Sequence, residues 1–89
     1  MELGEIEAAL ATHPDVKEVA TVSVADEKSG VRIRAFLSFL EHRPSIIELK
    51  QFCVDKLPGY MVPDTFTPVE KLPRTSTDKI DYQRLKDLS

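Results

Sequence analysis

The sequence predicts an α+β fold, in which a small sheet of about three strands with a central antiparallel hairpin is packed with two to three helices. Two observations lead to this prediction. Between residues 16 and 39, two runs rich in β-branched residues flank a short polar turn, which is the pattern of a hairpin. On either side of the hairpin, apolar residues recur at spacings of three and four, which is typical of amphipathic helices. The 89 residues allow one domain with a modest core.

The first helix is expected from about residue 4 to residue 12, because Leu3, Ile6 and Leu10 fall on one face. Pro14 ends it, since the residue before a proline is pushed away from helical geometry. His13 is therefore interpreted as a helix-end residue.

In the hairpin, the first strand has Ala20 and Val22 on one face, and the polar turn after it contains Gly30, which can adopt a positive φ. In the second strand, Ile33 and Leu37 point one way while Arg34 and Ser38 point the other way. The two strands are therefore expected to pair antiparallel.

The second helix begins with a capping box, in which Ser45 can accept from the amide of Glu48 and Glu48 can reach back. Pro58 and Gly59 end it. Its predicted apolar face consists of Ile46, Leu49, Cys53 and Leu57, with Phe52 beside them.

After the second helix, prolines leave room only for a short strand at about 66–69. Tyr60 and Met61, just before it, are interpreted as packing residues. Asp81 is predicted to cap a last helix that has Leu85 and Leu88 on its apolar face.

Composition narrows the classes of function. The net charge of −3 argues against nucleic-acid binding, and no apolar run approaches the length of a membrane span. His13, His42 and Cys53 lack the spacing of metal ligands, so we expect no metal site. Cys53 is interpreted as a small core residue. A single cysteine rules out an internal disulfide and favours a reducing, cytoplasmic location.

One loop has side chains that could bind an anion. Residues 74–79 combine hydroxyl and cationic side chains, which suit an anion because they donate hydrogen bonds and supply positive charge. Composition alone favours the simpler interpretation of a solvated loop before a helix. The side chains concerned are Arg74, Thr75, Ser76, Thr77 and Lys79.

Three motifs resemble motifs of one enzyme family, and they occur in the same order as in that family. PRTSTDKIDYQRLK at 73–86 is similar to the last core motif of adenylate-forming enzymes, which include acyl-CoA synthetases and the adenylation domains of nonribosomal peptide synthetases. LPGYMVP at 57–63 resembles the motif before it, and ELGEIEAAL at 2–10 resembles the end of the motif at the domain hinge. The resemblance covers residues 1–89 as the mobile C-terminal lid subdomain only, so the N-terminal core domain is absent from this sequence.

The resemblance implies an activity and named roles. Family members use ATP and Mg²⁺, held mainly by the N-terminal core, to convert a carboxylic acid into an acyl-adenylate. They then transfer the acyl group to coenzyme A or to the phosphopantetheine of a carrier protein. Lys79 matches the lysine that serves adenylation, while Gly4 and Glu5 match the loop that faces the thiol tunnel. The isolated chain is therefore expected to bind no cofactor and to be inactive, with the core domain and a carrier protein as partners.

Asp78 departs from the family pattern, which has glycine there. Aspartate is among the few residues that tolerate a positive φ, so the loop can keep its shape. The acid can pair with Lys79 and repel phosphates, so adenylation is expected to be slower than in an Asp78→Gly variant. The end of the motif resembles amino-acid-loading enzymes somewhat more than others.

Two further interpretations stand beside the catalytic lid. A free-standing, non-catalytic module could dock on a carrier protein or on an adenylation core, and an unrelated small domain could match the motifs by chance. The abrupt helical start favours a fragment of a longer protein over a complete gene product.

Overall fold

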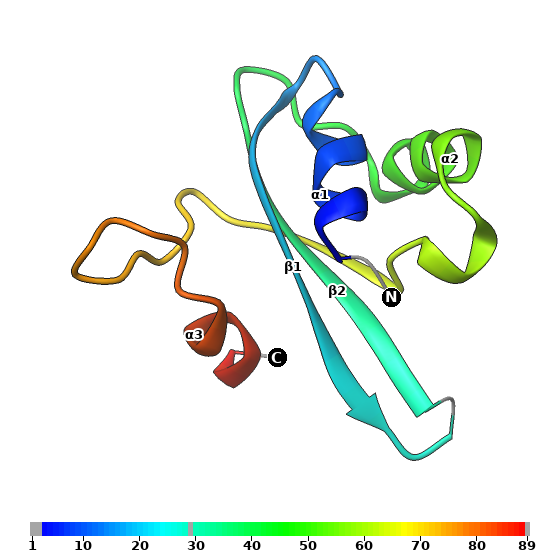
Figure 1. Ribbon diagram of the computed structural model, residues 1–89. Helices are drawn as coiled ribbons and strands as arrows, with labels where there is room; N and C mark the ends of the chain where they lie inside the picture. The colour runs from blue at the N-terminus through cyan, green and yellow to red at the C-terminus, as the bar shows by residue number, and fades with distance from the viewer. Residues whose placement is uncertain (1–2, 29, 89) are drawn as a thin grey trace.

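The structure is a computed structural model that describes residues 3–28 and 30–88. The described residues form three α-helices, one short 3-10 helix and one three-stranded sheet (Figure 1). The elements are α1 (Leu3–Ala11), β1 (Val16–Asp26), β2 (Gly30–Phe39), α2 (Ile46–Lys56), η1 (Gly59–Met61), β3 (Thr65–Pro68) and α3 (Tyr82–Asp87). The predicted α+β class is confirmed.

The first helix lies within a residue of its predicted bounds, with Ile6 and Leu10 fully buried. The chain leaves it through a compact turn at His13, whose Nδ1 accepts from the Asp15 amide at 3.0 Å. The His13 ring stands edge-on to Phe52 of α2, with the ring centroids 4.8 Å apart. This residue therefore closes the helix and links it to α2.

The predicted hairpin is present. β1 and β2 pair antiparallel, with Val19 opposite Leu37, and Gly30 has the expected positive φ, at 84°. β3 then pairs with β2 in parallel, with Phe66 opposite Ala35, so the strand order is β1-β2-β3. The third strand had been predicted one residue later, at 66–69, and without a direction.

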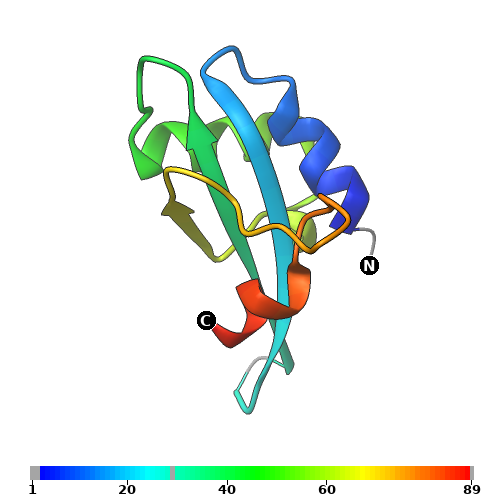
Figure 2. The same ribbon diagram turned by 90° about the vertical axis from the view of Figure 1, so that its left-hand side faces the viewer.

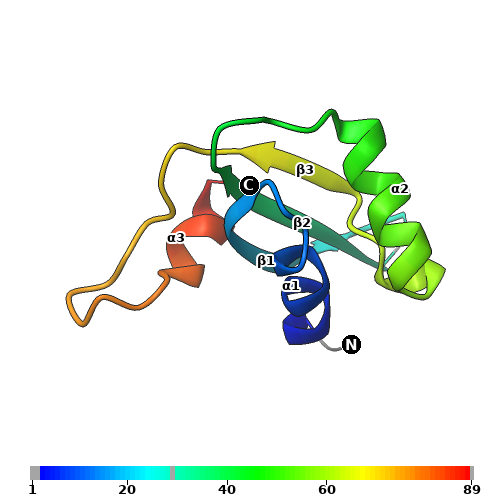
Figure 3. The same cartoon turned by 90° about the horizontal axis from the view of Figure 1, so that it is seen from above.

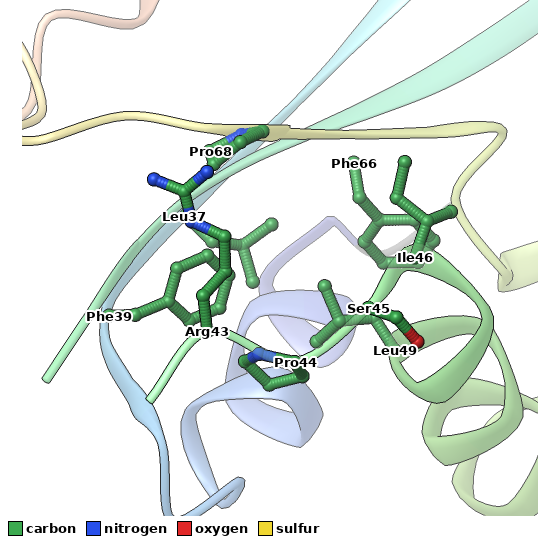
Figure 4. A pocket seen from close by; sticks show the side chains of 9 residues that line it. All are labelled: Leu37, Phe39, Arg43, Pro44, Ser45, Ile46, Leu49, Phe66 and Pro68. Atoms are coloured by element: carbon green, nitrogen blue, oxygen red, sulfur yellow. The ribbon is translucent and has the colours of Figure 1, made fainter. Parts of the chain in front are cut away.

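The second helix starts as predicted, because the Ser45 hydroxyl accepts from the Glu48 amide at 3.1 Å. Leu49 and Cys53 are buried, but the prediction for Ile46 is wrong, since its side chain is 56% exposed. Ile46 belongs to the first turn of the helix, which overhangs the sheet at the rim of a pocket (Figure 4).

Both faces of the sheet are covered, as Figures 1 and 3 show, with α1 and α2 on one face and α3 on the other. Ser38, which points away from Leu37, is only 1% exposed because the segment leading to α3 crosses that face. Leu85 is buried there as predicted, whereas Leu88 is exposed because α3 ends at Asp87.

Two motif residues next to η1 differ in burial. Met61 is buried in the core as predicted, but Tyr60 is 74% exposed, so its interpretation as a packing residue is wrong. Successive residues of a tight turn point in different directions, and this one sends only Met61 inward.

Candidate active-site loop and its surroundings

The loop at 75–79 is a tight hairpin rather than an irregular coil. Arg74 and Ile80 form an antiparallel bridge at its base. Within it, the Thr75 amide donates to the Lys79 carbonyl at 2.7 Å, and the Asp78 amide donates to the Thr75 carbonyl at 2.9 Å. The loop projects away from the sheet, to the left in Figure 1, so that in Figure 2 it lies in front of the strands and points toward the viewer. It therefore holds a defined shape on its own backbone hydrogen bonds.

Asp78 occupies the one position in this hairpin that needs left-handed geometry. Its φ is 63°, and it is the only residue other than glycine with a positive φ in the part of the chain that the structure describes. A turn followed by a left-handed residue is a common form of three-residue hairpin loop. The expectation that aspartate tolerates a positive φ at this position is therefore confirmed.

Lys79 is exposed at the end of this hairpin. Its amide donates to the Thr75 hydroxyl at 3.3 Å, and that hydroxyl lies 3.0 Å from the hydroxyl of Thr77. Among residues 3–28 and 30–88, the Lys79 ammonium forms no salt bridge, either with Asp78 or with any other acid. The backbone of Lys79 is thus fixed while its charge stays available. Ser76 lies exposed at the tip.

The second cation of the loop, Arg74, is already paired. Its guanidinium forms a salt bridge with Glu18 of β1 and donates to the carbonyl of Asp78 at 3.4 Å. Its positive charge is therefore largely neutralised, and its contacts join the base of the loop to the sheet. The side chains predicted to surround an anion consequently differ in role, since Arg74 supports the loop and Lys79 carries the free charge.

Asp81 caps the last helix as predicted, because its carboxylate accepts from the Arg84 amide at 3.1 Å. Its own amide donates to the carbonyl of Pro73 at 2.9 Å. The residue therefore closes the base of the loop and starts α3.

Gly4 and Glu5 lie in the first turn of α1 and are exposed. A side chain at Gly4 would meet no atom within 4 Å, so the fold of this chain does not itself require glycine there. Figures 1 and 3 place the start of α1 well away from the loop at 75–79. The structure therefore does not bring the two predicted groups of site residues together.

A polar cluster that no sequence pattern indicated lies between these two groups. The Tyr82 hydroxyl of α3 donates to the Glu7 carboxylate of α1, at 2.9 and 3.1 Å from its two oxygens. Burial, followed by this hydrogen bond and the charge of Glu7, raises the pKa of Tyr82 to about 12. The two residues are 75 positions apart, so no local pattern could pair them. Their adjacency to Gly4 and Lys79 in the motifs was the only available signal.

A separate pocket of about 230 Å³ lies between α2 and the β2–β3 edge (Figure 4). Phe39, Leu49 and Phe66 line it with other apolar side chains, and Arg43 is its charged residue. None of the predicted site residues is among the described residues that line it.

Within residues 3–28 and 30–88, neither a metal centre nor a membrane span is indicated. Within the described ranges, no group of three or more His, Cys, Asp and Glu side chains could hold a metal ion. No helix among those residues is long and apolar enough to cross a bilayer.

Comparison with known proteins identifies relatives over almost the whole chain. Residues 5–79 match the family model described as the AMP-binding enzyme C-terminal domain. The chain is 41% identical over 88 residues to a 2-methylpropanoate–CoA ligase from Humulus lupulus, covering 96% of this chain and 16% of the ligase. It is 36% identical over 85 residues to a dimodular nonribosomal peptide synthase from Bacillus subtilis, covering 96% of this chain and 4% of the synthase.

A solved structure shares the fold. The o-succinylbenzoate CoA synthetase of Bacillus subtilis, solved in complex with its acyl-adenylate intermediate, superimposes with a TM-score of 0.87 at 33% identity. The match covers 98% of this chain and 18% of the synthetase. The chain therefore spans less than a fifth of each of these relatives.

Proposed function

The chain belongs to the family of AMP-binding enzyme C-terminal domains, and we propose from this that it acts as the mobile lid of an ATP-dependent acid–thiol ligase, together with a larger N-terminal adenylation core. The observation that carries the proposal is the state of Lys79. Its backbone is held in a hydrogen-bonded hairpin, while its ammonium is exposed and unpaired among the described residues. A cation presented in this way suits a reaction that occurs on another domain.

In the first step, the carboxylate of the substrate attacks the α-phosphate of ATP and pyrophosphate leaves. Negative charge builds up on the phosphate oxygens in the transition state. Lys79 is proposed to stabilise that charge from the lid side, because a preoriented cation stabilises developing charge without reorganisation. A lysine suits this delivery, since it is a compact point charge on a flexible stem.

ATP and Mg²⁺ would be held mainly by the core. The described residues offer one unpaired cation and several hydroxyl groups at the loop, which is too small a donor set for a triphosphate. They also contain no cluster of acids for a metal ion. The contribution of this chain is therefore limited to closing the site and supplying charge.

In the second step, the thiol attacks the acyl carbon of the acyl-adenylate, the thioester forms and AMP leaves. Gly4 and Glu5, exposed at the start of α1, are proposed to face that thiol after the lid rotates, with Gly4 leaving room for the pantetheine arm. The relatives include both a CoA ligase and a nonribosomal peptide synthase, so coenzyme A and a carrier protein are both acceptors of the right chemistry. The buried single cysteine is compatible with a cytoplasmic setting.

The proposal can be tested in a chimera that joins this chain to the core of the 2-methylpropanoate–CoA ligase, in place of that enzyme's own C-terminal domain. Pyrophosphate exchange driven by 2-methylpropanoate measures the first step. The chimera is expected to be active, and Lys79→Ala is expected to lower the exchange rate at least about 100-fold, the scale of losing one preorganised transition-state donor. Lys50→Ala, which removes an exposed lysine of α2, is the matched control. An inactive chimera, or equal rates for the two variants, would contradict the proposal.

Asp78 provides a second test of the same site. Its carboxylate lies next to Lys79 in sequence and would repel the phosphates of ATP. Asp78→Gly keeps the positive φ at no steric cost and removes that charge, so it is expected to accelerate pyrophosphate exchange. Equal rates in the two chimeras would show that the acid does not oppose adenylation.

The non-catalytic binding module remains the alternative, because a copy without a catalytic role could lose the glycine at position 78. It predicts that the 89-residue chain binds a carrier protein or a core domain while the chimera performs no pyrophosphate exchange. Binding measured by calorimetry, combined with exchange measured in the chimera, separates the two functions.

A further inference from the structure

We propose that Tyr82, through Glu7, is a positioning residue for Lys79, and that with the Arg74–Glu18 pair it fixes both ends of the loop at 75–79. This inference rests on the proposed role of Lys79. It assigns a function to two side-chain contacts that lie outside the loop itself.

At the C-terminal end of the loop, Tyr82 is connected through Glu7 to the sheet. The Glu7 carboxylate that receives its hydroxyl also accepts from the amide of Thr21 at 2.8 Å and from the Thr21 hydroxyl at 3.3 Å. Thr21 is fully buried in β1. Glu7 is thus held by β1 at the edge of the sheet, and α3 is connected through it to the β1–β2 hairpin.

At the N-terminal end, the connection is ionic. Arg74 pairs with Glu18, which also belongs to β1, and the same guanidinium donates to the carbonyl of Asp78 inside the loop. Both ends of the hairpin are therefore fastened to one strand, β1. The loop between them carries Lys79 one residue before the bridge residue Ile80.

Apolar packing alone would hold this segment weakly. α3 has only six residues, which is too short for a helix to be stable by itself. From the segment after β3, Leu72 and Leu85 are buried members of the cluster on this face, and Val69 and Ile80 pack against it partly buried. None of these side chains belongs to the loop at 75–79, so the polar contacts of Tyr82 and Arg74 are proposed to add to its order.

Such order matters for catalysis by a lid. A displacement of about 1 Å in a catalytic group can cost about 100-fold in rate. A loop that projects from the sheet (Figures 1 and 3) would transmit any rotation of α3 to the position of Lys79. Fastening both ends to β1 limits that motion.

The first experiment compares Tyr82→Phe with Tyr60→Phe in the chimera. Each variant loses one hydroxyl, but Tyr60 is highly exposed and lies outside the loop. Tyr82→Phe is expected to lower kcat for pyrophosphate exchange about fivefold, as for one lost hydrogen bond. The KM for ATP should be unchanged, because the core holds the nucleotide. Tyr60→Phe should alter neither value. A raised KM with kcat unchanged would overturn the inference.

The second experiment needs no enzymatic activity. Amide hydrogen exchange in the 89-residue chain reports on the loop through the hydrogen-bonded amides of Thr75, Asp78 and Asp81. Tyr82→Phe is expected to speed their exchange about fivefold, for the same lost hydrogen bond, while the amides between β1 and β2 keep their rates. Unchanged exchange in the loop would overturn the inference even if Lys79 is essential.

The two proposals therefore fail separately. If Lys79→Ala leaves exchange of pyrophosphate unchanged, the proposed function is wrong, yet the loop amides still report whether Tyr82 holds the loop. Glu7→Gln adds a check, since combining it with Tyr82→Phe should give no more loop exchange than the stronger single variant. Additive effects would show that the two residues act independently.

Discussion

The two faces of the sheet are built very differently. On the face covered by α1 and α2, ten of the described residues form one buried apolar cluster that includes Ile6, Leu10, Leu37 and Leu49. On the face covered by α3, five form a second cluster, including Phe36 and Leu85. The first face is held by apolar burial, whereas the second combines a small cluster with the polar contacts of Arg74 and Tyr82.

This difference indicates that one face stabilises the fold while the other orients the loop. Hydrophobic burial is non-directional and stabilises the hairpin as a scaffold. Hydrogen bonds and ion pairs have defined geometry, so they can orient a loop without a large core beneath it. The proposed catalytic lysine is accordingly carried by the smaller, more polar face.

The largest effect is expected from the larger cluster. Leu10→Ala removes a fully buried side chain of α1 and should lower the free energy of unfolding by about 3 kcal/mol. Urea unfolding followed by circular dichroism measures it. Ile47→Ala, at a highly exposed position of α2, is the control and should change stability by less than about 0.5 kcal/mol. A small effect of Leu10→Ala would mean that this face does not dominate stability.

A somewhat smaller effect is expected on the α3 face. Leu85→Ala should cost about 2 kcal/mol, mainly by releasing α3 and the loop while the hairpin stays folded. Hydrogen exchange would show faster rates in 74–88 and unchanged rates in β1 and β2, with the exposed Leu88→Ala as the control. Equal acceleration everywhere would show instead that the two faces unfold as one unit.

Alkaline pH distinguishes the faces through one titratable group on each, the buried thiol of Cys53 and the partly exposed phenol of Tyr82. Burial raises the pKa of Cys53 from 9.0 to about 11, while the pKa of Tyr82 rises from 10.0 to about 12. Folding therefore favours the protonated forms, and this stability is present below the unfolded pKa and lost as pH rises through the folded one. The loss begins near pH 9 for Cys53 and near pH 10 for Tyr82.

At pH 10, the loss from Cys53 should be about 1 kcal/mol relative to pH 8. Urea unfolding at a series of pH values measures this loss. In Cys53→Ala, the plot of the free energy of unfolding against pH should be flatter between pH 8 and 10. Tyr82→Phe should flatten it only above pH 10. The same slope in all three proteins would contradict the assignment.

The smallest effects concern the helix caps, one on each face. Ser45→Ala removes the acceptor for the Glu48 amide, and Asp81→Ala removes the acceptor for the Arg84 amide. Each should cost about 0.5–1 kcal/mol in urea unfolding. Asp81→Ala should also speed hydrogen exchange in the loop, whereas Ser45→Ala should not. Faster loop exchange in Ser45→Ala would show that the two faces are coupled.

Local patterns predicted most of the secondary structure. The capping residues Ser45 and Asp81, the turn at Gly30 and the alternation in the hairpin each depend on neighbours within a few positions, and all were confirmed. The errors at Ile46, Tyr60 and Leu88 have separate local causes. Helical periodicity places Ile46 on the apolar face, but the first turn of α2 overhangs the sheet. Tyr60 lies in a tight turn that sends only Met61 inward, and Leu88 follows the end of α3 at Asp87.

The sequence by itself determined the helices, the hairpin, the family motifs and the tolerance of Asp78 for left-handed geometry, because these follow from side-chain periodicity and backbone sterics. Only the tertiary structure decided the parallel pairing of β3, the burial of Ser38, and the contacts of Glu7 with Tyr82 and of Glu18 with Arg74. These contacts join residues more than 50 positions apart. Which residues meet in these contacts depends on how the helices and strands pack, and local sequence patterns carry no information about that packing.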